Sequence, residues 1–362
     1  CGGDVPGAYL QGEQQPEEQM VLRAPTGFRV YDERGVEVVW LMQHPLYGQT
    51  DAGAIWNRTI NAFLVGELGY ERSTHDPGLY VKRVRGGDGR CIIPLYVDDL
   101  RVYYDQNVKE QAVEDLAKLT EKYKIEFGAM DPKHDYFLGA DRVRHDEHCA
   151  TVHSATYIRL MVKRYLPDGI ERSSEHPGKW STLPADDELI KAHQSAVQRK
   201  PEASAELTAR YGSLVGSLQY AVKYRPEIGC ALGLCSQCLT FPTEELYTCA
   251  KRILIYLGRT ENIGTTYCGK GDNAGVLKAY ADSNWAETRS TTGYCLMLAR
   301  AMITGTSRRQ HCITMSSCEA ELVALADCAI ELLFTLGVLE LLGYPTGESI
   351  EVFTDNKAAH DL

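Results

Sequence analysis

A pair of adjacent acids between two apolar stretches most constrains how this chain can fold. Asp98 and Asp99 follow the apolar run 91–95 and precede the apolar run 102–104. This pattern predicts two strands joined by a tight turn, with the acids at the turn. The strand-like run 79–85 and the glycine-rich turn 86–89 predict a third strand, paired with the first of these two.

The two neighbouring carboxylates allow two interpretations of that turn, a metal site or a solvated turn. The carboxylates repel each other, and they become useful when a divalent cation neutralises them, because Mg²⁺ prefers hard oxygen ligands beside substrate phosphates. The alternative is a solvated turn, in which Asp is common. The dipeptide alone favours the solvated turn, so the rest of the sequence has to decide.

Composition sets outer limits on fold and function. The chain has 362 residues, enough for two or three domains, and its 44% apolar and 24% charged residues are typical of a soluble globular protein. A net charge of −11 argues against a general nucleic-acid coat protein but allows an enzyme with a local basic groove. The twelve cysteines lack a framework spacing, which predicts reduced thiols in an intracellular protein. Cys235 and Cys238 form a CxxC in an apolar, helix-like stretch, which we interpret as packing and not as a zinc site.

The sequence predicts no membrane-spanning segment. The most apolar stretch, 324–344, has a helical rhythm and contains Asp327, Glu331 and Glu340, which predicts a globular helix. The sequence starts at Cys1 and not at a Met, and its first residues do not have the pattern expected of a signal peptide. The pattern breaks off at Leu362, so we expect a fragment of a longer protein.

Motifs in a fixed order run along nearly the whole chain. In order they are 4–12, 46–48 with 51–53 and Trp56, 76–81, 96–100, 137–139, 211–220 with 225–228, 281–285, 316–321 and 354–356. This order resembles the copia-type retrotransposon Pol polyprotein, from the middle of its reverse transcriptase through most of its ribonuclease H domain. The co-linear order is far more specific than any single motif.

The resemblance implies a multi-domain fold of the α+β and α/β classes. It implies a reverse-transcriptase palm without fingers at 1–145, a thumb and connection at 146–273, and a C-terminally truncated ribonuclease H-like domain at 274–362. It also implies Mg²⁺ or Mn²⁺ in both catalytic sites. The implied partners are an RNA template, a DNA primer, the RNA–DNA hybrid, dNTPs and other parts of the Pol polyprotein, with no membrane. The implied location is intracellular, in a cytoplasmic particle and in the nucleus.

In the polymerase half, the resemblance implies that Asp4 and Asp98 are the principal metal ligands, with Asp99 a less direct partner. Phosphoryl transfer of this kind uses two metal ions about 4 Å apart, bridged by carboxylates. Asp4 and the hairpin must then lie on neighbouring strands. Tyr9 resembles the aromatic gate that packs under the incoming sugar and rejects a 2′-hydroxyl. The alternatives are a disordered terminal acid for Asp4 and an ordinary half-buried aromatic for Tyr9.

The nucleotide-pocket motif departs from the family pattern. Gly48 and Asp51 belong to this motif, but the usual Leu-Lys-Gln reads Gln-Thr-Asp at 49–51. An acid there would repel a triphosphate unless Asp51 points away. The helix that follows is predicted to supply core residues at helical spacing, Trp56, Ile60, Phe63 and Leu64. Because the fingers are absent, we expect no polymerase activity from this chain alone.

In the last part, acids stand where strands and a helix meet. The runs 276–281, 293–298 and 301–306 predict antiparallel strands, and 350–354 predicts a further strand. Between them, a helix is predicted from Ser316–Ser317 through Glu321 towards residue 336. The resemblance implies that Asp282, Glu321 and Asp355 hold two metals that activate water against an RNA phosphodiester.

Two glutamates compete for the helix position. Ser316 and Glu319 form a capping box, which gives Glu319 a structural role. Glu321 precedes Leu-Val-Ala-Leu as the family's catalytic Glu does, so we assign the metal to Glu321. Asn284 stands where the family often has a second Asp, and a fourth acid would lie beyond Leu362.

Basic side chains are the candidates for contacts with nucleic-acid phosphates, because Arg and Lys dominate backbone binding. The candidates are Lys251, Arg252, Arg308, Arg309 and His311. The alternative is a solvated basic face, favoured at least as much for Lys251 and Arg252. The polar stretch 184–206 is interpreted as an exposed linker.

A second function remains open beside the enzyme. The departures at Thr50, Asp51 and Asn284 are consistent with a decayed or co-opted copy that binds nucleic acid or protein without catalysis. The presence of all six principal acids favours descent from an active enzyme.

Overall fold

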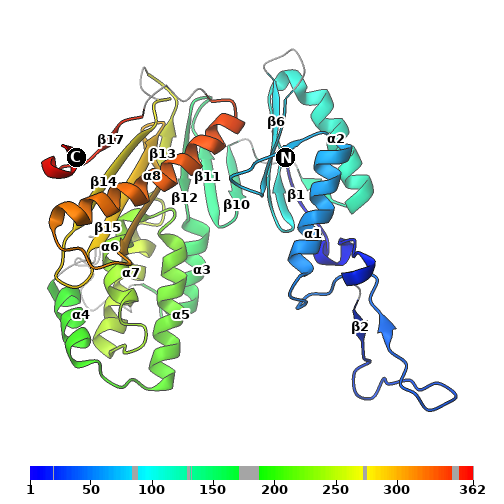
Figure 1. Cartoon of the computed structure of the whole chain (residues 1–362), viewed down its shortest axis with the longest axis horizontal. Coiled ribbons are helices and arrows are strands. Elements are labelled where there is room, and N and C mark those ends of the chain that lie inside the picture. The colour runs from blue at the N-terminus through cyan, green and yellow to red at the C-terminus, as the bar shows by residue number, and fades with distance from the viewer. Residues whose placement is uncertain are drawn as a thin grey trace. The chain divides into compact units, whose positions relative to one another are not determined.

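The computed structural model describes residues 1–18, 20–83, 89–128, 131, 133–170, 187–271, 275–344 and 350–361 (Figure 1). The chain forms two compact units, Cys1–Met130 with Gly337–Tyr344 and Asp131–Leu336 with Pro345–Leu362. Both contain helices and strands, so the predicted mixed α and β composition is confirmed. The break lies at 130/131, and the second unit has no break at 273/274. The division into three domains stays a prediction.

The first unit is built on an antiparallel sheet of order β4-β5-β6-β7-β1-β9, with β8 also paired to β6. Its strands are β1 (Gly2–Asp4), β4 (Glu71–Arg72), β5 (Leu79–Arg83), β6 (Arg90–Tyr96), β7 (Asp99–Arg101), β8 (Tyr103–Tyr104) and β9 (Glu126–Gly128). The predicted hairpin around Asp98 is therefore present, and β5 pairs with β6 as predicted. The predicted turn at 86–89 falls largely outside the described residues.

Two helices cover this sheet and form its core. They are α1 (Ala52–Asn61), which continues as the π-helical segment η3 (Ala62–Glu67), and α2 (Lys109–Tyr123). The short 3₁₀ segments are η1 (Ala8–Gln11), η2 (Pro16–Glu18) and η4 (Gln106–Val108). Trp56 and Phe63 each meet the Tyr123 ring edge-on at 5.4 Å between centroids. Trp56, Ile60, Phe63 and Leu64 are all buried, so the predicted core face of α1 is confirmed.

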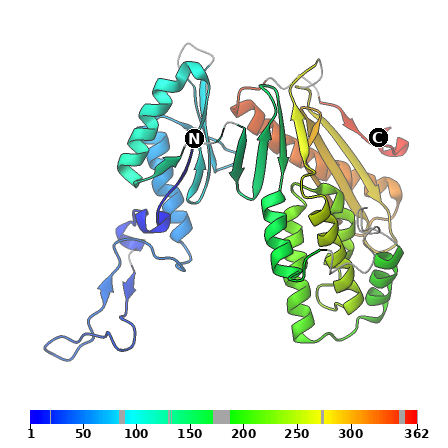
Figure 2. The ribbon, with the colours of Figure 1, turned by 180° about the vertical axis from the view of Figure 1, so that it is seen from behind.

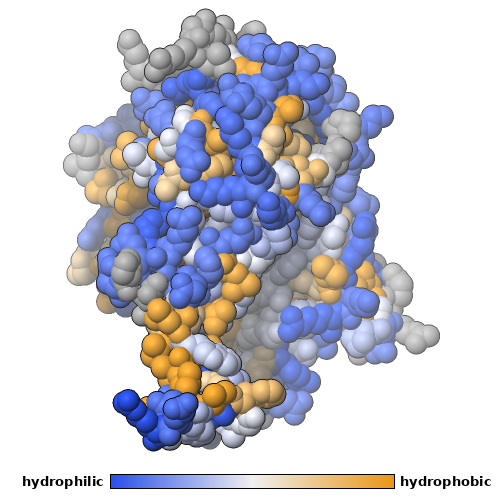
Figure 3. Space-filling model, turned by 90° about the vertical axis from the view of Figure 1, so that its right-hand side faces the viewer, coloured by the Kyte–Doolittle hydropathy of each residue, from blue (hydrophilic) through white to orange (hydrophobic). Residues whose placement is uncertain are grey.

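A β-arm extends from the first unit, and sequence reasoning did not anticipate it. Strands β2 (Val21–Leu22) and β3 (Trp40–Leu41) pair in it, and Val38 N–H donates to Val30 C=O further out. Its apolar side chains are largely exposed, as the orange surface at the foot of Figure 3 shows.

The second unit contains a helical layer with its own core. Its helices are α3 (Ala155–Tyr165), α4 (Asp187–Arg199), α5 (Ala205–Ala221), the short η6 (Pro226–Ile228), α6 (Gly229–Ser236) and α7 (Glu244–Arg259). Cys235 and Cys238 are fully buried in this core, as the packing interpretation predicted.

The predicted linker at 184–206 is wrong for most of its length. Helix α4 occupies Asp187–Arg199, and its Leu189 and Ala196 are fully buried. Asp187 and Glu188, two of the acids that make this stretch polar, lie in the first turn of α4, where negative charge is favoured by the helix dipole. Residues 184–186 lie outside the described residues.

A small antiparallel sheet of order β10-β11-β12-β13 adjoins these helices. Its strands are β10 (His134–Phe137), β11 (Ala140–Arg144), β12 (Cys149–His153) and β13 (Thr265–Cys268). Cys149 and Cys268 face each other across β12 and β13 and form a disulfide. The expectation of reduced thiols throughout is therefore wrong for this pair.

The last sheet has the order β16-β15-β14-β17, antiparallel except for the parallel pair β14 and β17. Its strands are β14 (Lys278–Asn284), β15 (Thr291–Leu298), β16 (Ala301–Arg309) and β17 (Val352–Phe353). Helix α8 (Ser317–Leu341) crosses one face of it, in front of the strands in Figure 1 and behind them in Figure 2. The short α9 (Lys357–His360) follows β17. The predicted strands and helix are confirmed, although β17 is shorter than the predicted run 350–354.

Helix α8 is unusually apolar. Within the described ranges it is the one helix long and apolar enough, by length and composition, to cross a membrane. Its acids bond to the sheet: Glu321 accepts from Ser283, and Glu331 accepts from the Thr304 hydroxyl.

Candidate metal sites and relatives of the chain

Asp4, Asp98 and Asp99, which the resemblance assigns to a palm and which are called the palm acids here, lie where β1 pairs with the hairpin of β6 and β7. Asp4 in β1 and Asp99 in β7 are directly opposite partners, and Val5 N–H donates to Asp98 C=O at 2.9 Å. The prediction that Asp4 and the hairpin lie on neighbouring strands is therefore confirmed. Burial raises the pKa of the Asp99 carboxyl, the charge of Asp98 raises it further, Arg101 lowers it and Asp4 raises it.

The turn that carries these acids is strained, and hydrogen bonds from residues outside the hairpin stabilise it. Val97 has φ 57°, in the left-handed region that a β-branched residue rarely adopts. The indole Nε1–H of buried Trp56 donates to Val97 C=O at 2.7 Å. With the Val5 bond to Asp98, both turn carbonyls have donors. Sequence reasoning gave Trp56 only a packing role, because nothing in the sequence indicates this hydrogen bond.

Arg101 is a cation on the acid-bearing strand that sequence reasoning missed. It stands two residues after Asp99, so both side chains lie on the same face of β7. Its register partner is Gly2, and a Cβ at Gly2 would lie 2.6 Å from Arg101 Nη1. Because glycine has no side chain, the Arg101 guanidinium can occupy the space over Gly2.

The residues proposed for nucleotide contact lie around the N-terminus of α1. The Tyr9 ring packs on Tyr47 with centroids 5.0 Å apart, and a Cβ at Gly53 would lie 3.8 Å from the Tyr9 hydroxyl. Gly48 has φ 96°, a conformation that favours glycine. Asp51 occupies the N-cap position of α1, and its buried Oδ1 accepts no hydrogen bond from the described residues.

A second group of acids converges in the C-terminal unit. Carboxylate oxygens of Asp282, Glu321 and Asp355 all lie within 4.8 Å of one another. The pairs Ala279–Val352 and Tyr280–Phe353 set the register of parallel strands β14 and β17. Continuing that register brings Asp282 level with Asp355. The predicted convergence of these three acids is confirmed, and their catalytic role stays a prediction.

The two competing glutamates have the orientations that the sequence predicted. Glu321 is 4% exposed, and its Oε1 accepts from Ser283 N at 3.2 Å and Ser283 Oγ at 2.8 Å. Glu319 turns back to the helix start: its N–H donates to Ser316 Oγ at 3.1 Å, and its Oε2 accepts from Met315 N at 2.6 Å.

The cluster around Glu321 fits a hard divalent cation. Glu321 Oε2 is buried, and among the described residues it has no hydrogen-bond partner. A buried carboxylate oxygen without a partner is costly, and a cation shared with Asp282 and Asp355 would satisfy it. Asp4, Asp98 and Asp99 form no such three-oxygen cluster in the described part of the chain. A metal shared by Asp4 and Asp98 therefore stays a prediction.

An aromatic pair beside these acids was also missed. The rings of Tyr280 and Phe353 stack with centroids 5.0 Å apart and an interplanar angle of 19°. Each precedes an acid of the cluster by two residues, Asp282 and Asp355 respectively. Both rings are about 40% exposed, so a flat apolar surface lies next to the acids.

The basic candidates separate into exposed and buried residues. Arg308 and Arg309 are exposed at the end of β16, and Arg308 pairs with Asp327 at 3.0 Å. His311 is exposed as well, and the half-buried Lys251 packs its ammonium over the Tyr247 ring.

The prediction that Arg252 contacts nucleic-acid phosphates is wrong. It is 4% exposed and forms an ion pair with Glu188 of α4. Its place on the inner face of α7 therefore removes it from the residues that could contact nucleic acid.

Comparisons with known proteins agree with the motif order. A family model described as reverse transcriptase (RNA-dependent DNA polymerase) matches residues 3–168. The chain is 28% identical over 363 residues to a retrovirus-related Pol polyprotein from transposon RE1 of Arabidopsis thaliana. It is also 28% identical over 365 residues to one from transposon TNT 1-94 of Nicotiana tabacum.

These matches cover nearly all of the chain but little of the relatives. They span 98% and 99% of the chain and 23% and 26% of the two polyproteins, about a quarter of their length. A solved foamy viral protease-reverse transcriptase in complex with RNA/DNA hybrid has a TM-score of 0.46 and 13% identity, over 97% of this chain and 38% of that one. Residues 3–168 thus match a reverse transcriptase family model, and the chain as a whole is similar to copia-type retrotransposon Pol polyproteins.

Proposed function

We propose that this reverse-transcriptase fragment also carries a ribonuclease H-type metal site, formed by Asp282, Glu321 and Asp355. The observation that carries the proposal is the approach of their carboxylate oxygens to within 4.8 Å of one another. Three carboxylates so close repel one another unless a cation lies between them. Mg²⁺ or Mn²⁺ bound there would activate water and stabilise the charge that develops on an RNA phosphodiester.

The residues of the chain orient this site before any substrate binds. Ser283 donates twice to Glu321 Oε1, which fixes the carboxylate and leaves Oε2 for the metal. Asp282 and Asp355 are exposed, so a phosphodiester can reach their side of the site. The substrate of this site would be the RNA strand of an RNA–DNA hybrid.

For the first unit we propose RNA-directed DNA synthesis by the parent protein, with Asp4, Asp98 and Asp99 as the metal-binding acids. Tyr9, Gly48 and Asp51 would lie on the dNTP side, near the start of α1. The paired strands β1 and β7 support this assignment, because they bring acids 95 positions apart in sequence, Asp4 and Asp99, into register. The RNA template, DNA primer and dNTPs would be its substrates.

One observation favours the non-catalytic alternative for the palm acids. The Arg101 guanidinium lies over Gly2 on the face that bears Asp99. A fixed cation there reduces the negative charge available to a divalent metal. We therefore expect weaker metal binding at the palm acids than at the Glu321 cluster.

A Mn²⁺ titration followed by electron paramagnetic resonance tests the proposed ribonuclease H site. The full chain would carry Asp98→Asn and Asp99→Asn, so that the palm acids do not contribute. Glu321→Gln in this background is expected to weaken Mn²⁺ binding by about tenfold or more, because a ligand oxygen is lost. Glu319→Gln is the matched control, since it changes a neighbouring glutamate of the same helix that only caps it. Equal affinity for Glu321→Gln and the unsubstituted background would refute the site.

A further inference from the structure

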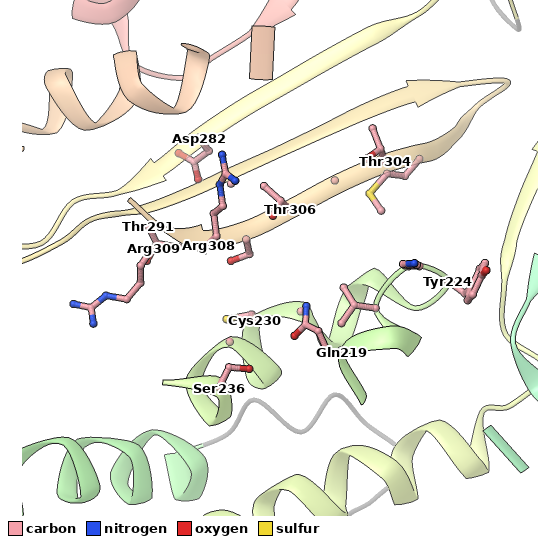
Figure 4. A pocket seen from close by; sticks show the side chains of 18 of the residues that line it. Gln219, Tyr224, Cys230, Ser236, Asp282, Thr291, Thr304, Thr306, Arg308 and Arg309 are labelled. Carbon is pink, nitrogen blue, oxygen red and sulfur yellow. The ribbon is translucent and has the colours of Figure 1, made fainter. Parts of the chain in front are cut away.

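Strand β16 ends close to the start of helix α8. Figure 4 shows Arg308 and Arg309 at this end of β16, where they line a cleft of about 1130 Å³. Gln310 follows directly and does not line the cleft, and its N–H continues the sheet by donating to Ser290 C=O at 2.8 Å. Side chains alternate along a strand, so Arg308, which pairs with Asp327 of α8, and Gln310 lie on the α8 side of the sheet. Gln310 is therefore directed towards the first turn of α8.

The Gln310 side chain is buried and makes two hydrogen bonds. It is 2% exposed, and its Nε2 donates to Ala320 C=O at 2.9 Å and to Thr292 Oγ1 at 3.1 Å. Ala320 C=O can only accept, so the nitrogen of the amide must face it. The amide Oε1 is buried and has no hydrogen-bond partner among the described residues. Burying an unpaired amide oxygen costs free energy, so packing alone does not explain a glutamine at this position.

The hydrogen bond to Ala320 acts directly on Glu321. Ala320 C=O belongs to the peptide that joins Ala320 to Glu321, and because this peptide is planar, its position fixes the backbone nitrogen of Glu321. A carbonyl oxygen can accept two hydrogen bonds, so the bond from Gln310 does not displace a bond of the helix. Gln310 therefore connects the backbone of Glu321 to the end of β16.

Glu321 is held from strands on both sides of β15. Ser283 of β14 donates to its carboxylate, and Gln310, after β16, holds its backbone. Thr292 of β15 is the register partner of Ser283 and accepts the second N–H of Gln310. The sheet thus restrains both the backbone and the carboxylate of this one residue.

We propose that Gln310 is a positioning residue for the acid cluster, which fixes the start of α8 so that the Glu321 carboxylate meets Asp282 and Asp355. The inference rests on the proposed metal site and adds a supporting residue to it. Such support matters, because ligands held about 1 Å out of place bind a metal poorly.

The amide of Ser283 reports on the position of Glu321 without any metal. Its N–H donates to Glu321 Oε1, so its hydrogen exchange becomes faster if Glu321 moves away. Gln310→Met keeps most of the side-chain volume and removes the donors. In EDTA, nuclear magnetic resonance of the full chain should show Ser283 exchange at least about fivefold faster in this variant, relative to the amides of β15. The β15 amides record any general loss of stability, so an unchanged ratio overturns the proposal.

Thr314→Val is the matched control. Thr314 is also 2% exposed and lies in the same connection between β16 and α8, where its hydroxyl pairs with Ser290 Oγ at 2.8 Å. This variant should lower the urea midpoint as Gln310→Met does but leave the Ser283 ratio unchanged. An equal rise of the ratio in the control would refute a specific role for Gln310. If Gln310→Met does not fold, Gln310→Asn replaces it with the same expected result, because the shorter amide cannot reach both of its partners.

Mn²⁺ affinity, measured with the palm acids replaced as above, gives a second readout. Gln310→Met should weaken Mn²⁺ binding by at least about threefold, and Thr314→Val should not. A faster Ser283 amide in Gln310→Met, combined with a Glu321→Gln variant that keeps its Mn²⁺ affinity, would support the role of Gln310 and refute the metal site. Loss of Mn²⁺ affinity in Glu321→Gln, with neither readout changed by Gln310→Met, would do the reverse.

Discussion

At the scale of single residues, the hairpin that carries Asp98 and Asp99 depends on contacts that no motif contains. The strained turn at Val97 is held by one indole hydrogen bond, and the acids beside it share their face with Arg101. The sequence could predict the hairpin and its acids from alternation and apolar flanks. It could not predict the Trp56 bond or the position of Arg101, because both depend on strands and helices far apart in sequence.

The Trp56 bond can be tested by replacing the indole with a smaller ring. Trp56→Phe should lower the free energy of unfolding by about 2 kcal/mol, because one hydrogen bond and part of a buried ring are lost. It should also speed amide hydrogen exchange in the peptide that covers 96–101. Tyr123→Phe is the control, since the Tyr123 hydroxyl is buried without a hydrogen-bond partner among the described residues. Identical exchange in the two variants would show that Trp56 only fills space.

The raised pKa of Asp99 predicts a pH-dependent decrease in the free energy of unfolding of the metal-free protein. Below the ordinary Asp pKa of about 4 the carboxyl is protonated in both folded and unfolded chains and contributes nothing. As the pH rises from the unfolded-state pKa to the higher folded-state pKa, the folded protein is increasingly destabilised, because ionisation is harder in the folded state, and above the folded-state pKa the loss of stability stays constant. Asp99→Asn should therefore stabilise the protein at pH 7 but not at pH 3, as measured by urea unfolding. A gain of equal size at both pH values would contradict this origin.

At the scale of helices and strands, a polar stretch of sequence is hard to interpret when part of it is buried in the folded protein. The strands and helix of the C-terminal sheet follow from clear alternation and from the Ser316–Glu319 cap. The stretch 184–206 looked like a linker, yet α4 packs Leu189 and Ala196 into the helical core. Arg252 looked like a surface cation, yet it pairs with Glu188 of that same helix. One missed helix therefore accounts for both errors.

A buried ion pair connects β5 to α2 in the first unit. Lys82 Nζ lies 3.0 and 2.8 Å from the two carboxylate oxygens of Asp115, whose side chain is 2% exposed. Asp115→Asn should destabilise the unit by about 3 kcal/mol, because Lys82 loses its buried counter-charge. Glu114→Gln, which breaks the exposed pair with neighbouring Lys118, should leave the urea midpoint unchanged. Similar midpoints for the two variants would show that the buried pair is dispensable.

At the scale of the whole molecule, two acid groups lie in two separate compact units. The palm acids come together through antiparallel register, and the Glu321 cluster comes together through parallel register and a crossing helix. The motif order predicted both groups. The motif order could not predict that only the Glu321 cluster brings three carboxylate oxygens together among the described residues, because this depends on side-chain orientation at each strand end.

A crystal structure of the full chain with Mn²⁺, recorded with anomalous scattering, would show whether Asp282, Glu321 and Asp355 bind a divalent metal. We predict an anomalous peak between the three carboxylates, within about 2.2 Å of Glu321 Oε2, and no peak there in Glu321→Gln crystals. Mn²⁺ bound elsewhere on the chain, with none at these three acids, would contradict the proposed metal site.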